Sequence, residues 1–498
     1  MIRLDHLLQQ DLPDTVAALQ VSGLALDNRQ IKPGMVFIAL QGTQQHGIRF
    51  AQAAEQVGAV AVLYEPQGVG PAELSALTVP AIAVPGLSGL LGGIADHFYQ
   101  QPSQSLFITG VTGTDGKTSV THFVAEAFNA LGQQAAVLGT IGSGSPGALE
   151  TSTHTTPDAI QVHGRLRELA ELGFDSVAME VSSHALDQQR VNAVRFDVAV
   201  LTNLTRDHLD YHGSVAAYAA AKRQLFHRDD LGYAVLNLDD EFGRSLATEL
   251  QDNTCQVVGY GIGEAADYPE KTVVASELDF SHQGITAHIT SPWGEGELKA
   301  GVLGRFNLEN LLAALTVLLV RGVGLAAALS AIGKVQTVPG RMERVYAGGQ
   351  QDDVLVVVDY AHTPGALHSV LQALQVHTTK RLICVFGCGG DRDAGKRPLM
   401  AAAAEQRADV VIVTDDNPRA ESPAQIFADI RNGFEQPERV TFEHDRALAI
   451  RNAIRSAQSG DVVLIAGKGH ETVQLVAQQT LAFDDREQAL MALQEGAA

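Results

Sequence analysis

Residues 105–132 read SLFITGVTGTDGKTSVTHFVAEAFNALG, and the rest of the chain is organised around this stretch. Its apolar start, LFIT, predicts a buried strand. Three closely spaced glycines follow, and then come Lys117, Thr118 and Ser119. Apolar side chains recur at helical spacing from there to Leu131. The stretch therefore predicts a strand, a glycine-rich loop and a helix, in that order.

A glycine-rich loop between a strand and a helix is typical of an anion site. Its backbone N–H groups and the positive end of the helix dipole point toward the bound anion. Lys117 adds a point charge for terminal phosphates, and the Thr118 hydroxyl suits Mg²⁺. The strict pattern GxxxxGK[ST] is not met, because position 111 is valine. We interpret the loop as a P-loop variant that binds ATP through Gly113, Thr114, Asp115, Gly116, Lys117, Thr118 and Ser119.

The composition excludes several classes of protein. At 498 residues the chain is too long for a single core, and about two to four domains are expected. Hydrophobic residues make up 45% and charged residues 18%, so the chain is globular rather than disordered. No apolar run reaches the ~18 residues that span a bilayer, and the N-terminus lacks the apolar core of a signal peptide. We therefore expect a soluble cytoplasmic protein without a membrane partner.

The net charge of −22 argues against non-specific binding of nucleic acid, so no nucleic-acid partner is expected. A phosphorylated substrate must then be held by local groups such as Lys117. The three cysteines, Cys255, Cys384 and Cys388, do not form a disulfide framework, which fits a reducing compartment. We expect the last two to be buried strand residues rather than zinc ligands.

The alternation of strands and helices predicts an α/β fold with three domains, at residues 1–101, 102–338 and 339–498. The first is a smaller α/β domain, with strands expected at 36–40, 59–63 and 81–84 and helices at 51–57 and 87–98. The central domain is expected to hold a mostly parallel sheet. Its strands are predicted at 135–138, 177–179, 198–201 and 234–236, its helices at 159–172, 215–226 and 308–320, and antiparallel strands at 271–305.

The third domain is expected to be Rossmann-like, with strands at 354–358, 382–386, 410–413 and 462–466. One of its helices has a clear start signal in Ser422 and Pro423. Ligands of such folds lie at the carboxyl ends of the strands. A polar cluster follows each of the four strands there: DYAHTP from Asp359, GCGGDRD from Gly387, DDNPR from Asp415 and GKGHE from Gly467. The clusters predict a ligand site, against the alternative of ordinary solvated loops.

Two residues of the central domain are candidate Mg²⁺ ligands near the phosphates. Glu180 and His208 each follow a predicted strand. Mg²⁺ prefers oxygen, so Glu180 is the better ligand by chemistry alone. A lone glutamate or histidine after a strand is more often a hydrogen-bonded structural residue. Lys222 lies inside a predicted helix, and its plain interpretation is a solvated surface side chain.

The third domain offers charged groups for a cleft. Arg341 lies just past the domain boundary and could reach phosphates from across a cleft, and Asp359 could bind ribose hydroxyls. The Arg419 guanidinium matches a carboxylate bidentately. Arg392 offers a second guanidinium, and Glu471 offers a carboxylate for an amine. Two arginines and an acid in one cleft would suit an amino-acid substrate.

At these residues the chain resembles the Mur ligase family, the ATP-dependent amide-forming enzymes of peptidoglycan synthesis. The resemblance covers essentially the whole chain. It is carried by motifs in the family's order: TGTDGKT, MEVSSHAL, NLTRDHLDYHG, YAAAK, GRFNLEN, PGRMERV, DYAHTP, FGCGGDRDAGKRP, DNPR and AGKGHE. They look most like the ligases that add the third residue to UDP-N-acetylmuramoyl-L-alanyl-D-glutamate. The resemblance implies three domains that bind the UDP-sugar nucleotide, ATP and the incoming amino acid, respectively.

The resemblance also implies binding residues. The uridine end is expected at Leu26, Asp27, Asn28, Arg29, Thr43, Gln44 and Gln45, and the muramoyl peptide at His154, Thr155, Thr156, Ser182, Gln188 and Arg190. Further ATP contacts are expected at Asn307, Arg341 and Asp359. The amino acid is expected at Arg392, Asp416, Asn417, Pro418, Arg419, Gly467 and Glu471.

Lys222 matches the family's carbamylated lysine (N6-carboxylysine), whose carbamate helps to hold a second Mg²⁺. The metal ligands implied in this way are Thr118, Glu180, His208 and Lys222. Carbamylation needs a neutral amine, so the neighbours of Lys222 should lower its pKa. The resemblance thus favours a catalytic Lys222 over a surface lysine.

The DNPR loop resembles the form that binds meso-diaminopimelate. L-Lysine lacks the distal carboxylate and would leave the charge of Arg419 unpaired. Two positions depart from the family's pattern. Asp115 stands where asparagine is usual and puts a carboxylate beside the phosphates, and Asn28 stands where serine is frequent but can still form a hydrogen bond.

The expected reaction is ADP-forming amide synthesis. ATP transfers its γ-phosphoryl group to the D-glutamate γ-carboxylate, and the amine of diaminopimelate attacks the resulting acyl phosphate. Lys117, Mg²⁺ and Arg341 would stabilise the developing charge. Domain closure would exclude water. We expect the enzyme to act as a monomer.

Other interpretations remain open. One is the L-lysine-adding ligase of the same family, against which Arg419 argues. A second is a folylpolyglutamate-type ligase, against which the N-terminal uridine-type motifs argue. A third is a non-catalytic P-loop protein, which would not need every strand-end polar cluster. A glycine-rich turn with a surface lysine would not explain the agreement of strand, loop, Lys-Thr pair and amphipathic helix.

Overall fold

The computed structural model describes residues 1–42, 45–152, 154–347 and 354–496. It divides into two compact units, Met1–Gly259 and Tyr260–Ala498, and the division falls within strand β14 (Gln256–Ile262). The α/β fold class is as predicted, whereas the predicted domain limits at 101 and 338 stay predictions. Across the described residues, no helix combines the length and apolar character that crossing a bilayer requires.

The first unit begins with a small parallel sheet in the order β3-β4-β5-β6. Its elements are β3 (Gly23–Ala25), β4 (Met35–Ala39), α3 (Ala51–Gln56), β5 (Ala61–Tyr64), β6 (Ala81–Ala83) and α5 (Leu87–Phe98). Successive side chains of a strand point to opposite faces. Val36 and Ile38 therefore pack in the core with α5, whereas Phe37 and Ala39 pack in the core with α3.

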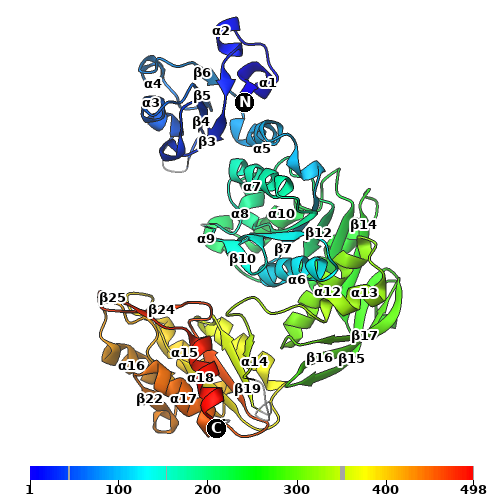
Figure 1. Ribbon diagram of the computed structural model, residues 1–498, viewed down its shortest axis with the longest axis vertical. Coiled ribbons are helices and arrows are strands. Elements are labelled where there is room, and N and C mark those ends of the chain that lie inside the picture. The colour runs from blue at the N-terminus through cyan, green and yellow to red at the C-terminus, as the bar shows by residue number, and fades with distance from the viewer. Residues whose placement is uncertain (43–44, 153, 348–353, 497–498) are drawn as a thin grey trace. The chain divides into compact units, whose positions relative to one another are not determined.

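The part of a larger sheet that lies in the first unit has the order β10-β9-β8-β11-β7-β12-β13-β14, and Figure 1 labels β7, β10, β12 and β14 in it. Neighbours from β8 to β13 are parallel, as predicted. The bounds are β7 (Phe107–Thr112), β8 (Ala135–Gly139), β9 (Gly142–Ser145), β10 (Ala148–Glu150), β11 (Ser176–Glu180), β12 (Val198–Leu201) and β13 (Tyr233–Asn237). The strands alternate with α6 (Lys117–Ala130), α7 (Ala159–Glu171), α8 (Ser183–Asp187), α9 (Leu209–His212), α10 (Val215–Arg223) and α11 (Glu241–Glu249).

The second unit opens with the predicted antiparallel strands β15 (Thr272–Ser281), β16 (Gly284–Ser291) and β17 (Gly294–Ala300). Helices α12 (Arg305–Val320) and α13 (Leu325–Ile332) follow. Helix α12 starts three residues before the predicted position 308, because Gly304 forms its N-cap with φ 86°. Asn307 therefore lies inside the first turn of the helix.

The C-terminal sheet has the order β18-β19-β23-β20-β21-β22, and β19, β23, β20, β21 and β22 run parallel. The strands are β18 (Glu343–Val345), β19 (Leu355–Asp359), β20 (Leu382–Phe386), β21 (Val410–Thr414), β22 (Thr441–Glu443) and β23 (Val462–Ala466). The helices are α14 (Pro364–Gln375), α15 (Lys396–Arg407), α16 (Pro423–Arg431), α17 (Arg446–Ser456) and α18 (Asp485–Gly496), and a hairpin is formed by β24 (Val473–Val476) and β25 (Gln479–Ala482).

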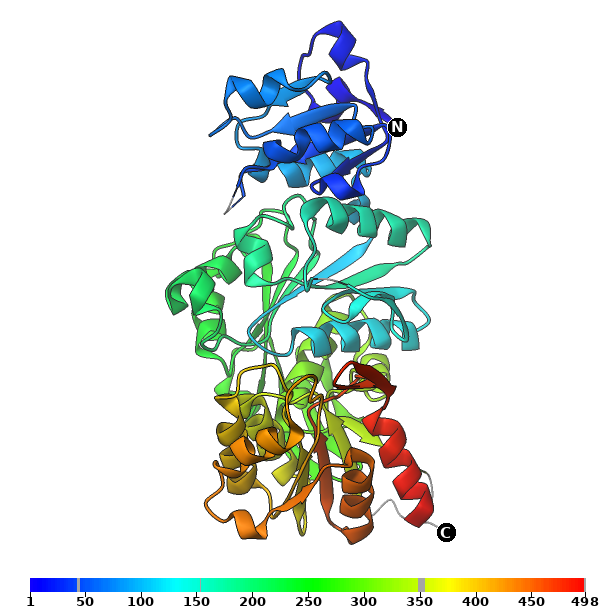
Figure 2. The same ribbon diagram turned by 90° about the vertical axis from the view of Figure 1, so that its left-hand side faces the viewer.

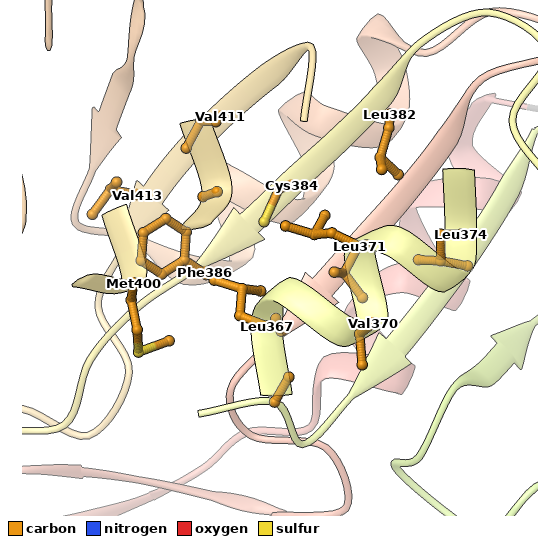
Figure 3. Packing of buried hydrophobic residues seen from close by; sticks show 14 of the residues in the cluster. Leu367, Val370, Leu371, Leu374, Leu382, Cys384, Phe386, Met400, Val411 and Val413 are labelled. Carbon is orange, nitrogen blue, oxygen red and sulfur yellow. The ribbon is translucent and has the colours of Figure 1, made fainter. Parts of the chain in front are cut away.

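Alternation along β20 builds both cores of this sheet. Cys384 and Phe386 face α14, α15 and α16, in the cluster of Figure 3. Ile383 and Val385 face α17 and α18 instead, and Figure 2 shows α18, in red, beside the sheet. The buried Cys384 confirms the predicted strand cysteine, whereas Cys388 is buried but lies in the loop after β20, so its predicted place in a strand is wrong. Burial raises the pKa of both thiols to about 12. Their positions agree with packing rather than zinc binding.

The start of α16 was predicted correctly at Ser422 and Pro423. The Ser422 side chain forms no capping hydrogen bond, however, and its backbone carbonyl accepts the first helical bonds from Gln425 and Ile426 instead. Several short elements were missed, namely β1 (Ile2–Arg3), α1 (Leu4–Leu8), α2 (Asp14–Ala17), β2 (Gln20–Val21) and α4 (Pro71–Ser75). They are too short to show a clear period.

Candidate active site

The loop between β7 and α6 has the geometry of a P-loop. The Lys117 ammonium donates to the carbonyl oxygens of Gly113 at 2.9 Å and Thr114 at 2.8 Å, so it lies folded over the loop. Gly113 and Gly116 have φ values of 151° and 82°, which favour glycine. A Cβ at Gly113 would also collide with the Thr202 hydroxyl. The loop conformation therefore requires the glycines of the sequence motif.

Asp115 holds the loop through its backbone. Its N–H donates to Asn203 Oδ1 at 2.9 Å, and its carbonyl accepts from the Thr202 hydroxyl at 2.6 Å. The Asp115 side chain is exposed. The carboxylate that departs from the family's pattern therefore adds charge to the loop surface without entering the loop's own hydrogen bonds.

Glu180 ends β11 and is buried below the P-loop. Its carboxylate accepts from the Thr118 hydroxyl at 3.1 Å, from the Thr140 N–H at 2.8 Å and from the Thr140 hydroxyl at 3.1 Å. Burial raises the pKa of Glu180, and the bonds from Thr140, the charge of Lys117 and the bond from Thr118 oppose that rise. A carboxylate beside a threonine hydroxyl is an oxygen donor set that fits Mg²⁺.

The packing of Glu180 against Gly139 gives a first prediction. A Cβ at Gly139 would collide with Glu180 Oε1, so Gly139→Ala should displace the carboxylate and lower ATP turnover by about tenfold or more. Steady-state ADP formation measures the effect. Gly93→Ala is the matched control, since no heavy atom lies within 4 Å of the position of its added Cβ. Equal rates of the two variants would show that the position of Glu180 is irrelevant to turnover.

Lys222 is not the surface residue that its helical position suggested. It lies on α10 with a side chain only 1% exposed, and its ammonium donates to the Gly113 carbonyl at 2.7 Å. The pKa of Lys222 is lowered to about 6, first by burial and then by the charge of Lys117. The lowered pKa favours the neutral amine, which is the state that carbamylation needs.

His208 is exposed at the start of α9, in the left-handed region with φ 51°. Its Nε2 lies 3.4 Å from Asp207 Oδ2, and its ring contacts the rings of His184 and Tyr218. Within the described residues, no three side chains of His, Cys, Asp or Glu converge as a metal site. The role of His208 as a metal ligand stays a prediction.

The predicted muramoyl-peptide residues gather around the end of β11. Thr156 donates from its hydroxyl to the Glu180 carbonyl at 2.8 Å, and Arg190 donates to the Thr156 carbonyl at 2.8 Å. Gln188 accepts from Arg190 Nε at 3.1 Å, and Ser182 caps α8. Two further members lie nearby in sequence: Thr155, whose hydroxyl accepts from Thr140 at 3.0 Å, and the exposed His154.

The predicted uridine residues lie in the first unit. Leu26 packs partly buried against the core, and Asn28 begins a short 3₁₀ helix that Asp27 caps. Arg29 forms an ion pair with Asp27 at 2.7 Å. Gln45 is exposed. The other two predicted positions, Thr43 and Gln44, lie outside the described residues.

The three predicted ATP contacts of the second unit differ in their surroundings. Asn307 is buried and donates to the Leu303 carbonyl at 2.8 Å. Asp359 is also buried, and its carboxylate accepts at 2.7 Å from the N–H groups of Met342 and Ala361. Burial raises the pKa of Asp359. Arg341 is exposed. The surroundings of these three residues do not test their predicted contacts with ATP, which stay predictions.

Most of the predicted amino-acid residues come together at the carboxyl ends of β21 and β23. Asn417 donates to Glu471 Oε2 at 2.8 Å, and Gly467 lies against the Asp416 carboxylate. Arg419 donates to the Gly390 carbonyl at 3.0 Å and has φ 52°. Pro418 is buried between Asn417 and Arg419. Arg392 is exposed instead, and no described residue is bonded to its side chain.

Sequence reasoning missed two side chains of these sites. Thr140 gives two hydrogen bonds to Glu180, and its place directly after β8, at the same sheet edge, could have indicated it. Lys468 is fully buried between Asn417 and Glu471, with 3.1 Å to each. Its place inside the GKGHE cluster was the available signal.

Family models match three segments of the chain. They are described as the Mur ligase middle domain at residues 111–318, the Mur ligase glutamate ligase domain at 340–469, and the catalytic domain of the Mur ligase family at 20–99. The middle-domain match contains most of the P-loop, Glu180 and Lys222. The glutamate-ligase match contains the DNPR loop.

Curated relatives match along almost the full length. The UDP-N-acetylmuramoyl-L-alanyl-D-glutamate--2,6-diaminopimelate ligases of Ectopseudomonas mendocina and Pseudomonas aeruginosa are 49% and 50% identical, and each match covers 98% of both chains. A solved structure of an enzyme with the same name is 37% identical, with a TM-score of 0.79 and coverage of 100% and 99%. MurF ligase from Thermotoga maritima in complex with ADP, 18% identical with a TM-score of 0.59 over 97% and 99%, shares the fold. The chain belongs to the Mur ligase family.

Proposed function

We propose that this chain is an ATP-dependent, ADP-forming ligase that joins meso-diaminopimelate to the D-glutamate γ-carboxylate of UDP-N-acetylmuramoyl-L-alanyl-D-glutamate. The observation that carries the proposal is the convergence of Lys117 and Lys222 on the Gly113 carbonyl, with Glu180 bonded to the Thr118 hydroxyl. Relatives that are about half identical over their whole length carry this activity in their names. The same proposal places the enzyme in the cytoplasm, in peptidoglycan precursor synthesis, as a monomer.

In this function the chain's own residues orient the reactants and compensate charge. The P-loop N–H groups and the N-terminus of α6 bind the phosphates of ATP. Lys117 leaves its carbonyl partners to neutralise the transferred phosphoryl group, with Arg341 as a second cation. Asn307 and Asp359 contribute to nucleotide binding. The γ-carboxylate oxygen of D-glutamate attacks the γ-phosphorus of ATP, ADP leaves, and an acyl phosphate forms. The neutral amine attacks its carbonyl carbon, and the tetrahedral intermediate loses a proton and phosphate to give the amide.

Mg²⁺ belongs to the proposal as well. Thr118, Glu180, His208 and a carbamate on Lys222 would hold Mg²⁺, with the carbamate helping to hold a second ion, and the bound ions would neutralise phosphate charge. Among these residues, Glu180 suits Mg²⁺ best, because its buried carboxylate provides oxygen donors beside the Thr118 hydroxyl. Thr156, which is bonded to the Glu180 carbonyl, together with Ser182, Gln188 and Arg190, would orient the muramoyl peptide toward this position.

The amino-acid site accounts for the choice of diaminopimelate. The Arg419 guanidinium pairs with the distal carboxylate, and Glu471 holds an ammonium group. L-Lysine would leave the charge of Arg419 without a carboxylate partner, which costs affinity. Arg392, exposed beside this loop, is the second guanidinium for a carboxylate.

Phosphate release tests the function and the choice of amino acid together. The assay contains the UDP-muramoyl dipeptide, ATP and Mg²⁺, with meso-diaminopimelate or L-lysine in parallel. We expect release with diaminopimelate alone, and Arg419→Leu should raise KM for diaminopimelate by about tenfold or more, since it removes a charge-assisted pair. Arg439→Leu, on the same unit, is the control. Release with lysine alone would refute the role given to Arg419, and no release with either would refute the ligase.

A further inference from the structure

Lys468, in the loop after β23, is fully buried although it carries an ammonium group. The glycines on either side turn the loop so that this side chain lies inside. Gly467 and Gly469 have φ values of 121° and 54°, in the left-handed region. A Cβ at Gly467 would lie 2.6 Å from Asp416 Oδ2. Burying an ammonium group is costly unless partners compensate its charge. The residues that are hydrogen-bonded to Lys468 therefore indicate its role.

The partners of Lys468 are two residues of the proposed amino-acid site. Its Nζ donates to Asn417 Oδ1 and to Glu471 Oε2, each at 3.1 Å. Asn417 Nδ2 also donates to Glu471 Oε2, at 2.8 Å. The three side chains therefore form a closed triangle of hydrogen bonds.

The triangle sets the orientation of the Asn417 amide. Asn417 Oδ1 accepts from Lys468 and also from the Leu475 N–H at 2.9 Å. A flipped amide would place its NH₂ group against these two donors, since a lysine ammonium and a backbone N–H cannot accept. Lys468 and Leu475 therefore keep the Asn417 NH₂ group directed at Glu471.

The triangle also makes the two oxygens of Glu471 unequal. Oε2 accepts both side-chain bonds, from Lys468 and from Asn417. Among the described residues no donor is bonded to Oε1, and the side chain is 31% exposed. One oxygen is thus held by the protein, while the other is left for a ligand. A cationic ligand suits it, because a carboxylate oxygen only accepts.

We propose that Lys468 is a positioning residue of the amino-acid site. It fixes the Asn417 amide and Glu471 Oε2, so that Glu471 Oε1 receives an ammonium group of the incoming amino acid. Lys468 itself is too deeply buried to touch the substrate, and it acts through these two side chains. The inference rests on the proposed function, which assigns Asn417 and Glu471 to that substrate.

Kinetics with each substrate varied in turn test this role. Lys468→Met should raise KM for meso-diaminopimelate by at least about tenfold and leave KM for ATP and for the UDP-muramoyl dipeptide within about twofold. Lys468→Gln keeps a neutral donor for Asn417 and should raise KM for diaminopimelate less. Lys380→Met, which removes an exposed lysine of the same unit, is the matched control. Unchanged KM in both Lys468 variants, or equal rises for all three substrates, overturns the proposal.

A double variant separates positioning from general loss of structure. If Lys468 acts through Glu471, then Lys468→Met adds little to the KM of Glu471→Gln. Multiplied effects would mean that Lys468 supports the fold independently, and would overturn the proposal. Failure of the proposed function shows itself separately, as no diaminopimelate-dependent phosphate release by the unaltered enzyme. If the unaltered enzyme releases no phosphate, calorimetric titration of meso-diaminopimelate into the unaltered protein and into Lys468→Met still tests the positioning role. Equal affinities of the two proteins would refute that role.

Discussion

Replacing Lys117 by alanine is expected to lower kcat by at least about 10²- to 10³-fold, because it removes the preorganised charge that faces the transferred phosphoryl group. The fold should survive. The bonds that Lys117 gives to Gly113 and Thr114 are only partly buried, and the two glycines keep the loop conformation. Phosphate release measures the rate, and thermal unfolding measures the integrity of the protein.

The control for this variant is Lys32→Ala, which removes an exposed lysine from the same unit. A second result is expected from the electrostatics. The charge of Lys117 helps to lower the pKa of Lys222, so the pKa of Lys222 should rise in Lys117→Ala. Wild-type turnover in Lys117→Ala would show that the loop is not the ATP site.

Replacing Lys222 by methionine should lower kcat by about 10²-fold or more, since the variant cannot form the carbamate that is expected to help hold Mg²⁺. The unaltered enzyme should lose activity in buffer depleted of carbon dioxide and regain it with bicarbonate. Activity that is indifferent to bicarbonate, together with an active Lys222→Met, would contradict carbamylation. Lys32→Met is the control substitution.

The lowered pKa of Lys222 predicts how the free energy of unfolding depends on pH in buffer without bicarbonate. Its folded pKa is about 6, whereas an unfolded lysine has a pKa near ~10.4. Between these values the unfolded chain binds the additional proton, so the free energy of unfolding rises with pH across this window. Lys222→Met removes this contribution, and the difference between the two proteins in urea titrations should shrink as pH rises from about 6 to about 10. A constant difference would mean that Lys222 is charged in the folded protein.

The long periodic elements were predictable from sequence. Helix α5 and strands β12, β20 and β23 have the predicted bounds, because clear apolar periods and short turns mark their ends. The P-loop followed from the order of strand, glycines, Lys-Thr and helix. The short N-terminal elements were missed because they are too short to show a clear period. The first three residues of α12 were missed because the helix begins at its cap, Gly304, before the apolar run that starts at Leu308.

The sequence and the tertiary structure determined different properties of this protein, and side-chain burial marks the difference. The sequence alone determined the α/β class, the P-loop and the polar cluster after each strand, because these depend on local order and on the meeting of parallel strand ends at one sheet edge. Spacing and composition could not tell that Lys222 and Lys468 are buried, since a lysine on a helix or in a loop is usually solvated, and only the family resemblance favoured a catalytic Lys222. Only the tertiary structure decided this, by packing one lysine beneath Gly113 and the other beneath Asn417 and Glu471. Long-range partners, more than 50 residues away for Gly113 and Asn417, hold both amines in place, and desolvation lowers the pKa of Lys222.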